Sequence, residues 1–132
     1  MRRDVAGDAD AGHPVPERPL RGGELNAAIT SAVVGVHTEF LGRGPRSAST
    51  FHHGVHVVTV LRGMLTRAEQ VLAAGRHADE VRAMRLLTRD AMVDELTAAI
   101  ERLTQRRVIA AVGGHDARSD ATAEVYVLDR PL

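Results

Sequence analysis

The sequence of 132 residues contains no cysteine, no lysine and no tryptophan. Without cysteine the chain can form no disulfide, thiolate zinc site, iron–sulfur cluster or thiol nucleophile. Without lysine it lacks the side chain that forms Schiff bases and the one that binds phosphate in a P-loop. Aromatic residues make up 2% of the composition, so a stacking platform for single-stranded nucleic acid is not expected.

An excess of either charge is also absent, since 17 arginines balance 17 acidic residues. Binding to a phosphate backbone needs a surplus of basic side chains, so we expect no nucleic-acid partner. The chain lacks the apolar run of about 7–15 residues that a signal peptide needs and the run of about 20 that spans a membrane. These absences predict a cytoplasmic protein with no direct membrane insertion.

What remains is the composition of a soluble globular protein, 44% hydrophobic and 26% charged. Residues 1–22 hold three prolines and eight charged residues without an apolar run, which predicts a disordered N-terminal tail. The remaining length suits one domain, which we place at residues 23–129.

Hydrophobic periodicity predicts the first elements of this domain. Apolar residues three and four apart predict a helix over residues 24–41, which Gly42 ends in a left-handed cap. Residues 47–52 and 55–62 predict a β-hairpin across His53-Gly54. The second strand is apolar on both faces, which indicates a central strand with one face under helices and the other open to a partner. The apolar positions of the helix are Leu25, Ile29, Val33, Val36 and Phe40.

Two more helices and a second hairpin follow. Thr66 with Glu69 predicts the capping box of a short helix that Gly75 ends. Asp79 is expected to cap a helix that runs to about residue 104 and measures about 40 Å, long enough to bend or to reach a dimer contact. Strands are expected over residues 108–112 and 121–128, with a polar turn at 113–120. The predicted stripe of the long helix is Val81, Met84, Leu87 or Thr88, Met92, Leu96, Ile100 and Leu103.

This element order, α-β-β-α-α-β-β, predicts an α+β fold. We expect a two-layer sandwich, with helices on one face of a four-stranded, mostly antiparallel sheet. The order of the strands stays open, because two hairpins can be joined in more than one way.

Histidines gather at the two predicted hairpin turns and are candidate metal ligands. They would form one site if both turns lay at the same end of the sheet. Their spacing matches no standard zinc pattern, so turn and surface histidines remain the alternative interpretation. The candidates are His52, His53 and His56 in the first hairpin and His115 and Asp116 in the second.

The loop after the first helix is a candidate site for an anion or a partner. Arg43, Gly44 and Arg46 could cradle a phosphate or a carboxylate there. The alternative is a helix cap followed by a turn that Pro45 fixes, because the negative end of a helix dipole repels an anion.

The other polar residues suggest no catalytic set. No serine stands in a G-x-S-x-G setting, and aspartates beside a turn commonly bond the local backbone. Arg82, Arg85 and Arg89 lie three and four residues apart and are expected to form a solvated helix face that pairs with acidic neighbours. We therefore predict no catalytic residue and no cofactor.

Three short motifs resemble the MpsC-like family of bacterial proteins. They are Gly42-Arg43-Gly44-Pro45, the L-x-G-x-L-T pattern from Leu61 to Thr66, and the segment from Glu124 to Leu128. The resemblance covers residues 23–129. Gln105 stands where a glycine is expected in the family, which puts the cap of the long helix in question. The family name refers to a sodium-translocating, membrane-potential-generating system, so the resemblance implies an accessory or regulatory cytosolic component and carries over no catalytic residue.

Two functions from different classes follow from the sequence. The first is a non-catalytic accessory or regulatory domain that forms a homo-oligomer, expected to be a dimer, and binds a protein partner at a membrane complex. The second is a sensor domain that binds a small anion or a metal through Arg43, Arg46 and the histidine turns. An enzyme ranks third, because the sequence contains no recognisable catalytic set.

Overall fold

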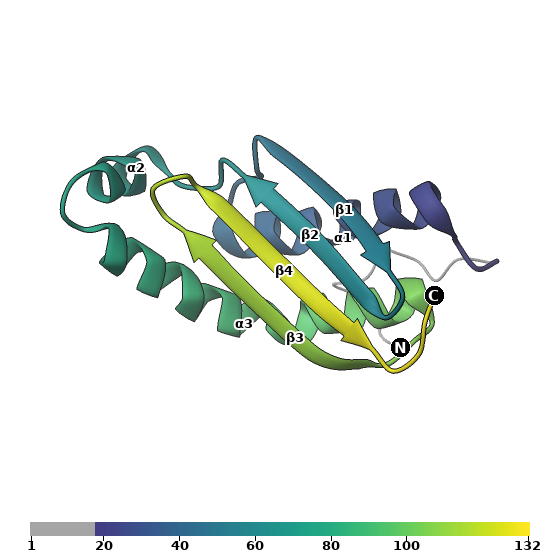
Figure 1. Cartoon of the computed structure of the whole chain (residues 1–132). Coiled ribbons are helices and arrows are strands. Elements are labelled where there is room, and N and C mark those ends of the chain that lie inside the picture. The colour runs from purple at the N-terminus through teal and green to yellow at the C-terminus, as the bar shows by residue number, and fades with distance from the viewer. Residues whose placement is uncertain (1–17) are drawn as a thin grey trace.

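The computed structural model describes residues 18–132, so most of the predicted tail at residues 1–22 lies outside the described residues. The described chain forms α1 (Gly22–Leu41), β1 (Ser47–His53), β2 (His56–Arg62), α2 (Arg67–Ala74), α3 (Ala78–Thr104), β3 (Val108–Asp116) and β4 (Ala121–Leu128). The strands pair antiparallel in the order β1-β2-β4-β3, and α1 and α3 lie on one face of the sheet (Figure 1). The predicted α+β sandwich is confirmed, and β2 is a central strand as expected.

The main core lies between the two long helices and the sheet. Leu25, Ile29 and Val33 of α1 are at most 2% exposed, whereas Phe40 at the end of the predicted stripe is 40% exposed. Tyr126 of β4 is fully buried opposite them. Burial of each of these large apolar side chains stabilises the fold by roughly 1.5–3 kcal/mol, so this layer is the main source of stability.

In the first half of α3, some of the buried residues differ from those that the apolar stripe predicted. Met84 and Leu87 are 58% and 66% exposed, while the side chains of Arg85 and Arg89 are 9% and 13% exposed. The two arginines continue the buried side of the helix from Met92 at spacings of three and four residues. The predicted stripe was therefore wrong at Met84 and at the Leu87 alternative, while Val81 is 4% exposed and lies inside the fold as predicted.

Local capping signals form at the first two helices as predicted. Gly42 takes a φ of 76° and donates to the carbonyl of Thr38 over 2.8 Å, which ends α1 in a left-handed cap. Thr66 and Glu69 form the reciprocal capping box that begins α2.

The ends of α3 differ in part from the prediction. The helix begins at Ala78 with His77 as its N-cap, so the predicted cap at Asp79 is wrong. Asp79 lies in the first turn instead, where its carboxylate complements the positive end of the helix dipole. At the other end Gln105 takes a φ of 55° and donates to the carbonyl of Glu101 over 2.9 Å. The left-handed cap thus forms without glycine.

β3 is longer than predicted, and its length moves the second hairpin turn. The strand continues to Asp116, so the turn spans residues 117–120 and not 113–120. Gly113 and Gly114 suggested a turn, yet both pair with β4 in the ladder. The turn closes at Asp120, which takes a φ of 52° and accepts a hydrogen bond from the amide of Met64 over 2.9 Å.

Candidate functional site

The candidate metal ligands lie at opposite ends of the sheet. His53 pairs with His56 beside the β1–β2 turn, whereas Asp116 pairs with Ala121 beside the β3–β4 turn. Ala121 in turn pairs with Arg62, at the end of β2 that is far from His56. Among residues 18–132 no group of three or more metal-ligating side chains is arranged to hold a metal ion. The structure therefore does not bring the five candidates together.

Two of these histidines have hydrogen-bond partners inside the fold. His52 Nδ1 lies 2.6 Å from Asn26 Oδ1 of α1, and His115 Nδ1 lies 2.8 Å from Thr122 Oγ1 of β4. His115 belongs to β3 and not to a turn as predicted, because the strand runs on past the two glycines. These contacts join neighbouring elements of the fold.

Arg43 ties the loop after α1 to the segment between β2 and α2. Its guanidinium donates to the carbonyl of Leu65 over 2.8 Å and to the carbonyl of Gly63 over 3.5 Å. Arg46 packs so closely on Gly63 that a Cβ there would lie 2.6 Å from the Arg46 Cβ. Arg43 and Arg46 thus both lie against Gly63, and backbone carbonyls already accept from two N–H groups of Arg43.

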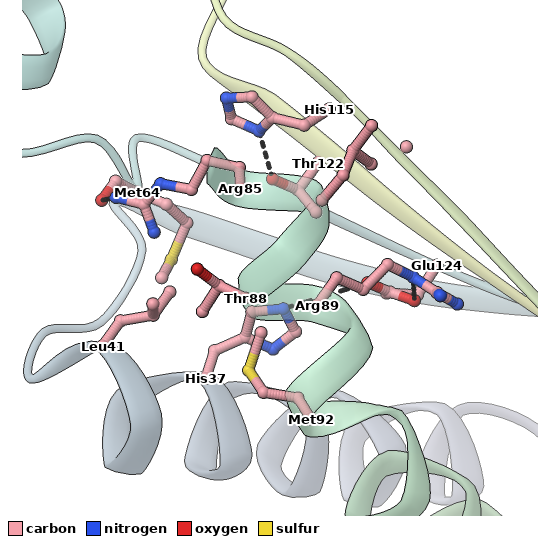
Figure 2. A pocket seen from close by; sticks show the side chains of 12 residues that line it. His37, Leu41, Met64, Arg85, Thr88, Arg89, Met92, His115, Thr122 and Glu124 are labelled. Atoms are coloured by element: carbon pink, nitrogen blue, oxygen red, sulfur yellow. Dashed lines mark hydrogen bonds and ion pairs between the residues drawn. The ribbon is translucent and has the colours of Figure 1, made fainter. Parts of the chain in front are cut away.

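Five polar side chains meet between the helices and the sheet, and we call them the buried polar cluster (Figure 2). Arg89 Nε donates to Glu124 Oε1 over 2.9 Å, and the Glu124 side chain is completely buried. The His37 side chain is 3% exposed, and its Nε2 lies 4.0 Å from Glu124 Oε2. The cluster consists of His37 from α1, Arg85 and Arg89 from α3, His115 from β3 and Glu124 from β4.

The two arginines of the cluster point in different directions (Figure 2). Arg85 extends toward Met64, where its Nη2 donates to the Met64 carbonyl over 3.1 Å and also to the carboxylate of Glu69. Arg89 extends toward Glu124. Arg85 therefore links α3 to the start of α2, and Arg89 links α3 to β4.

Burial sets the protonation of the cluster. Desolvation raises the pKa of Glu124 to about 7, while the charge and the hydrogen bond of Arg89 act in the opposite direction. Burial also lowers the pKa of His37 and of His115, and the positive charge of Arg85 lowers both further. Both histidines are therefore neutral at pH 7.

Several buried atoms of the cluster have no hydrogen-bond partner among the described residues. Each such group costs about 1–3 kcal/mol when it stays unpaired. The cavity beside them has a volume of about 20 Å³, room for about one water molecule. The arrangement can hold a proton or a water, and the cavity is too small for an organic substrate. The atoms are Arg85 Nε and Nη1, Arg89 Nη2, His115 Nε2 and Glu124 Oε2.

The expectation that Arg85 and Arg89 belong to a solvated face is wrong. Arginine usually faces solvent, so its residue type gave no reason to place it inside. Two features of the sequence indicate that these arginines lie inside the fold. The arginines continue the buried side of α3, and Glu124 alternates with the buried Tyr126 on the helix-facing side of β4. Gly113, directly opposite Glu124, leaves the space that the Arg89 side chain occupies.

The sheet face turned away from the helices is left uncovered by the described residues, and we call it the open face (Figure 1). Its central row crosses all strands, since Phe51 pairs with Val58, Val58 with Val125, and Val125 with Val112. Phe51 is 55% and Val112 is 60% exposed. A solvated face of an antiparallel sheet usually carries polar residues, so this apolar surface needs an explanation. Its apolar residues are Phe51, Val58, Val60, Ala110, Val112, Ala123, Val125 and Val127.

Comparison with known proteins gives one match. A family model described as "Na+-translocating membrane potential-generating system (MpsC)" matches residues 21–130, which include every helix and strand described above. No curated protein and no solved structure shows a significant similarity to the chain. Over residues 18–132, no helix combines the length and the apolar character needed to cross a membrane.

Proposed function

The chain belongs to the MpsC family, and from this premise we propose that it is a non-catalytic accessory or regulatory component of a membrane ion-translocating system. It acts in the cytoplasm as a homodimer and binds a protein partner of the membrane complex. The observation that supports self-association is the open face, where an apolar row runs across all four strands.

The open face is large enough to form an interface with the same face of a second copy. The strands lie about 4.8 Å apart and rise about 3.4 Å per residue, so this face measures roughly 19 by 24 Å. Two copies packed face to face would cover on the order of 1,000 Å² in total, the lower limit of a specific interface. Sheets in β-sandwiches pack in this way, with their side chains interdigitating.

The rows of the open face suit a two-fold axis parallel to the strands. Such an axis places Val58 of one copy over Val125 of the other, so the apolar central row meets itself. At one end of the face Arg62 and Asp116 lie in a single row, on opposite sides of Ala121. The rotation brings each of these charges toward the opposite charge of the second copy, which favours this arrangement.

Sedimentation equilibrium of the full chain over micromolar concentrations tests the proposal. The wild type should form a dimer, and Val112→Glu should weaken its association by at least about 100-fold. The new carboxylate would be buried twice in a symmetric interface, without a partner for its charge.

Val71→Glu is the matched control. Val71 on α2 is also a valine and also 60% exposed, but it lies away from the open face. This substitution should leave the association constant unchanged, and circular dichroism shows that both variants are folded. A wild type that stays monomeric throughout, or an equal loss of association in both variants, would contradict the proposed dimer.

A further inference from the structure

His37 directs a lone pair toward Glu124. Its Nδ1 lies 2.9 Å from the carbonyl oxygen of Val33, one turn earlier in α1. A carbonyl oxygen can only accept a hydrogen bond, so Nδ1 carries the proton of this bond. Because the ring of His37 is neutral at pH 7, its Nε2 holds a lone pair and no proton.

Glu124 directs a second lone pair toward the same point. Its Oε1 accepts from Arg89 Nε over 2.9 Å. Its Oε2 is buried, and no group of the described chain donates to it. This oxygen lies 4.0 Å from His37 Nε2. Two acceptors therefore face each other across a gap a little longer than a hydrogen bond, an arrangement that is unfavourable for both.

One proton satisfies both atoms. We propose that His37 and Glu124 form a buried proton-binding site, in which a proton from solvent bonds to Glu124 Oε2 and is shared as a hydrogen bond with His37 Nε2. The O–H bond forms on the carboxylate, nothing is oxidised or reduced, and the charge of the cluster rises by one unit. A shift of about 1 Å in these side chains closes the gap to the length of a normal hydrogen bond.

The groups packed against the pair direct the proton to the carboxylate. The positive charges of Arg85 and Arg89 disfavour a second positive charge on the His37 ring. Burial and the charge of Glu124 raise the pKa of Tyr126, so its hydroxyl keeps its proton. Burial alone would raise the pKa of Glu69, but its hydrogen bonds from Thr66 and Arg85 lower it overall. Arg85 and Arg89 from α3 and Tyr126 from β4 act on the pair directly, while His115 from β3 and Glu69 from α2 interact with Arg85.

The affinity of the site for a proton lies in the range of ordinary cellular pH. Burial raises the pKa of Glu124 to about 7, so the site is about half occupied at that pH. A change of pH across neutrality then adds or removes one charge where α1, α3 and β4 meet.

Carbon- and nitrogen-detected NMR of the full chain between about pH 5.5 and pH 9 tests this site directly. The carboxyl carbon of Glu124 should titrate with a midpoint near pH 7. The Nε2 resonance of His37 should shift at the same midpoint, as it becomes the acceptor of a hydrogen bond, while Nδ1 keeps its proton throughout. A Glu124 midpoint below about pH 5, or a His37 ring that gains a second proton, would overturn the proposal.

Two substitutions sharpen the test. Glu124→Gln removes the carboxylate, so the His37 step near pH 7 should disappear, and a step that persists would also overturn the proposal. Glu39→Gln removes an exposed carboxylate from the same helix as His37 and should leave the step unchanged. If Glu124→Gln does not fold, the titration of the wild type decides the question by itself.

Discussion

At the scale of single residues, Gly113 lies directly opposite Glu124 in the ladder of β3 and β4, under the side chain of Arg89. A Cβ at this position would lie 1.9 Å from Arg89 Nε. Gly113→Ala should displace the Arg89 side chain and break its ion pair with Glu124, which lowers the free energy of unfolding by about 1–3 kcal/mol. Urea unfolding followed by circular dichroism, at low protein concentration, measures this loss.

The neighbouring Gly114 provides the control. In the described structure a Cβ built on Gly114 has nothing within 4 Å. Gly114→Ala should therefore change the free energy of unfolding by less than about 0.5 kcal/mol. If both substitutions destabilise the protein equally, the contact between Gly113 and Arg89 is not what requires a glycine in this strand.

The polar residues inside the fold were the least predictable part of the sequence. Arg89 is buried because Glu124, 35 residues further along the chain, supplies its hydrogen bond. Neither the residue types of Arg89 and Glu124 nor their immediate neighbours in the sequence indicate that the two side chains pair. His115 could be placed correctly once β3 was known to continue past Gly114, since alternation then turns it toward the helices.

At the scale of elements, the junction of α1, α3 and β4 should make stability depend on pH. The pKa of Glu124 is raised from 4.5 to about 7, so the folded protein binds this proton more tightly than the unfolded chain does. The resulting stabilisation is fully present below about pH 4.5 and is lost as the pH rises through 7. Relative to Glu124→Gln, the wild type should lose roughly 3 kcal/mol of unfolding free energy between pH 4.5 and pH 8.5.

Denaturant unfolding of both proteins at a series of pH values measures this difference. Burial lowers the pKa of His37 and of His115, and their stabilisation is present above pH 6.5 and lost as the pH falls through the lowered values. The same two histidines are present in both proteins, so their contribution largely cancels in the comparison. Parallel stability curves for the two proteins would show that Glu124 has an ordinary pKa.

The elements themselves were largely predictable from periodicity and caps. The helix over residues 24–41 and the capping box at Thr66 follow from local rules, and the structure confirms both. The second hairpin was less predictable because two consecutive glycines, Gly113 and Gly114, favour a turn. Both glycines lie in a strand because they pair with β4, and Gly113 leaves the space that Arg89 occupies. This pairing is a long-range contact that local turn rules do not contain.

At the scale of the whole molecule, the length of α3 is explained by a second small core. The C-terminal half of the helix covers the sheet, while Val81 near its start packs with Leu65, Ala73 and Ala117. α2 lies beside the beginning of α3, past the end of the sheet (Figure 1). The extra length of α3 therefore serves packing within one chain.

The two apolar faces of β2 were visible in the sequence, and in the structure the outward face of β2 is part of one apolar row that crosses all four strands. The inward face lies under α1 and α3, as predicted. The outward face gathers residues from four separated segments into one row, and strand order decides which of them are neighbours. The sequence could therefore suggest a partner surface on one strand, while its full extent depended on the order β1-β2-β4-β3.

The accessibility of valine methyl groups to a soluble paramagnetic probe tests the proposed dimer most directly. At a concentration where the dimer forms, the methyl groups of Val58, Val60 and Val125 should be protected from relaxation, while those of the 60% exposed Val71 relax fast. In Val112→Glu the open-face methyl groups should become accessible again. Open-face valines that relax as fast as Val71 in the wild type would contradict the claim that a second copy covers this face.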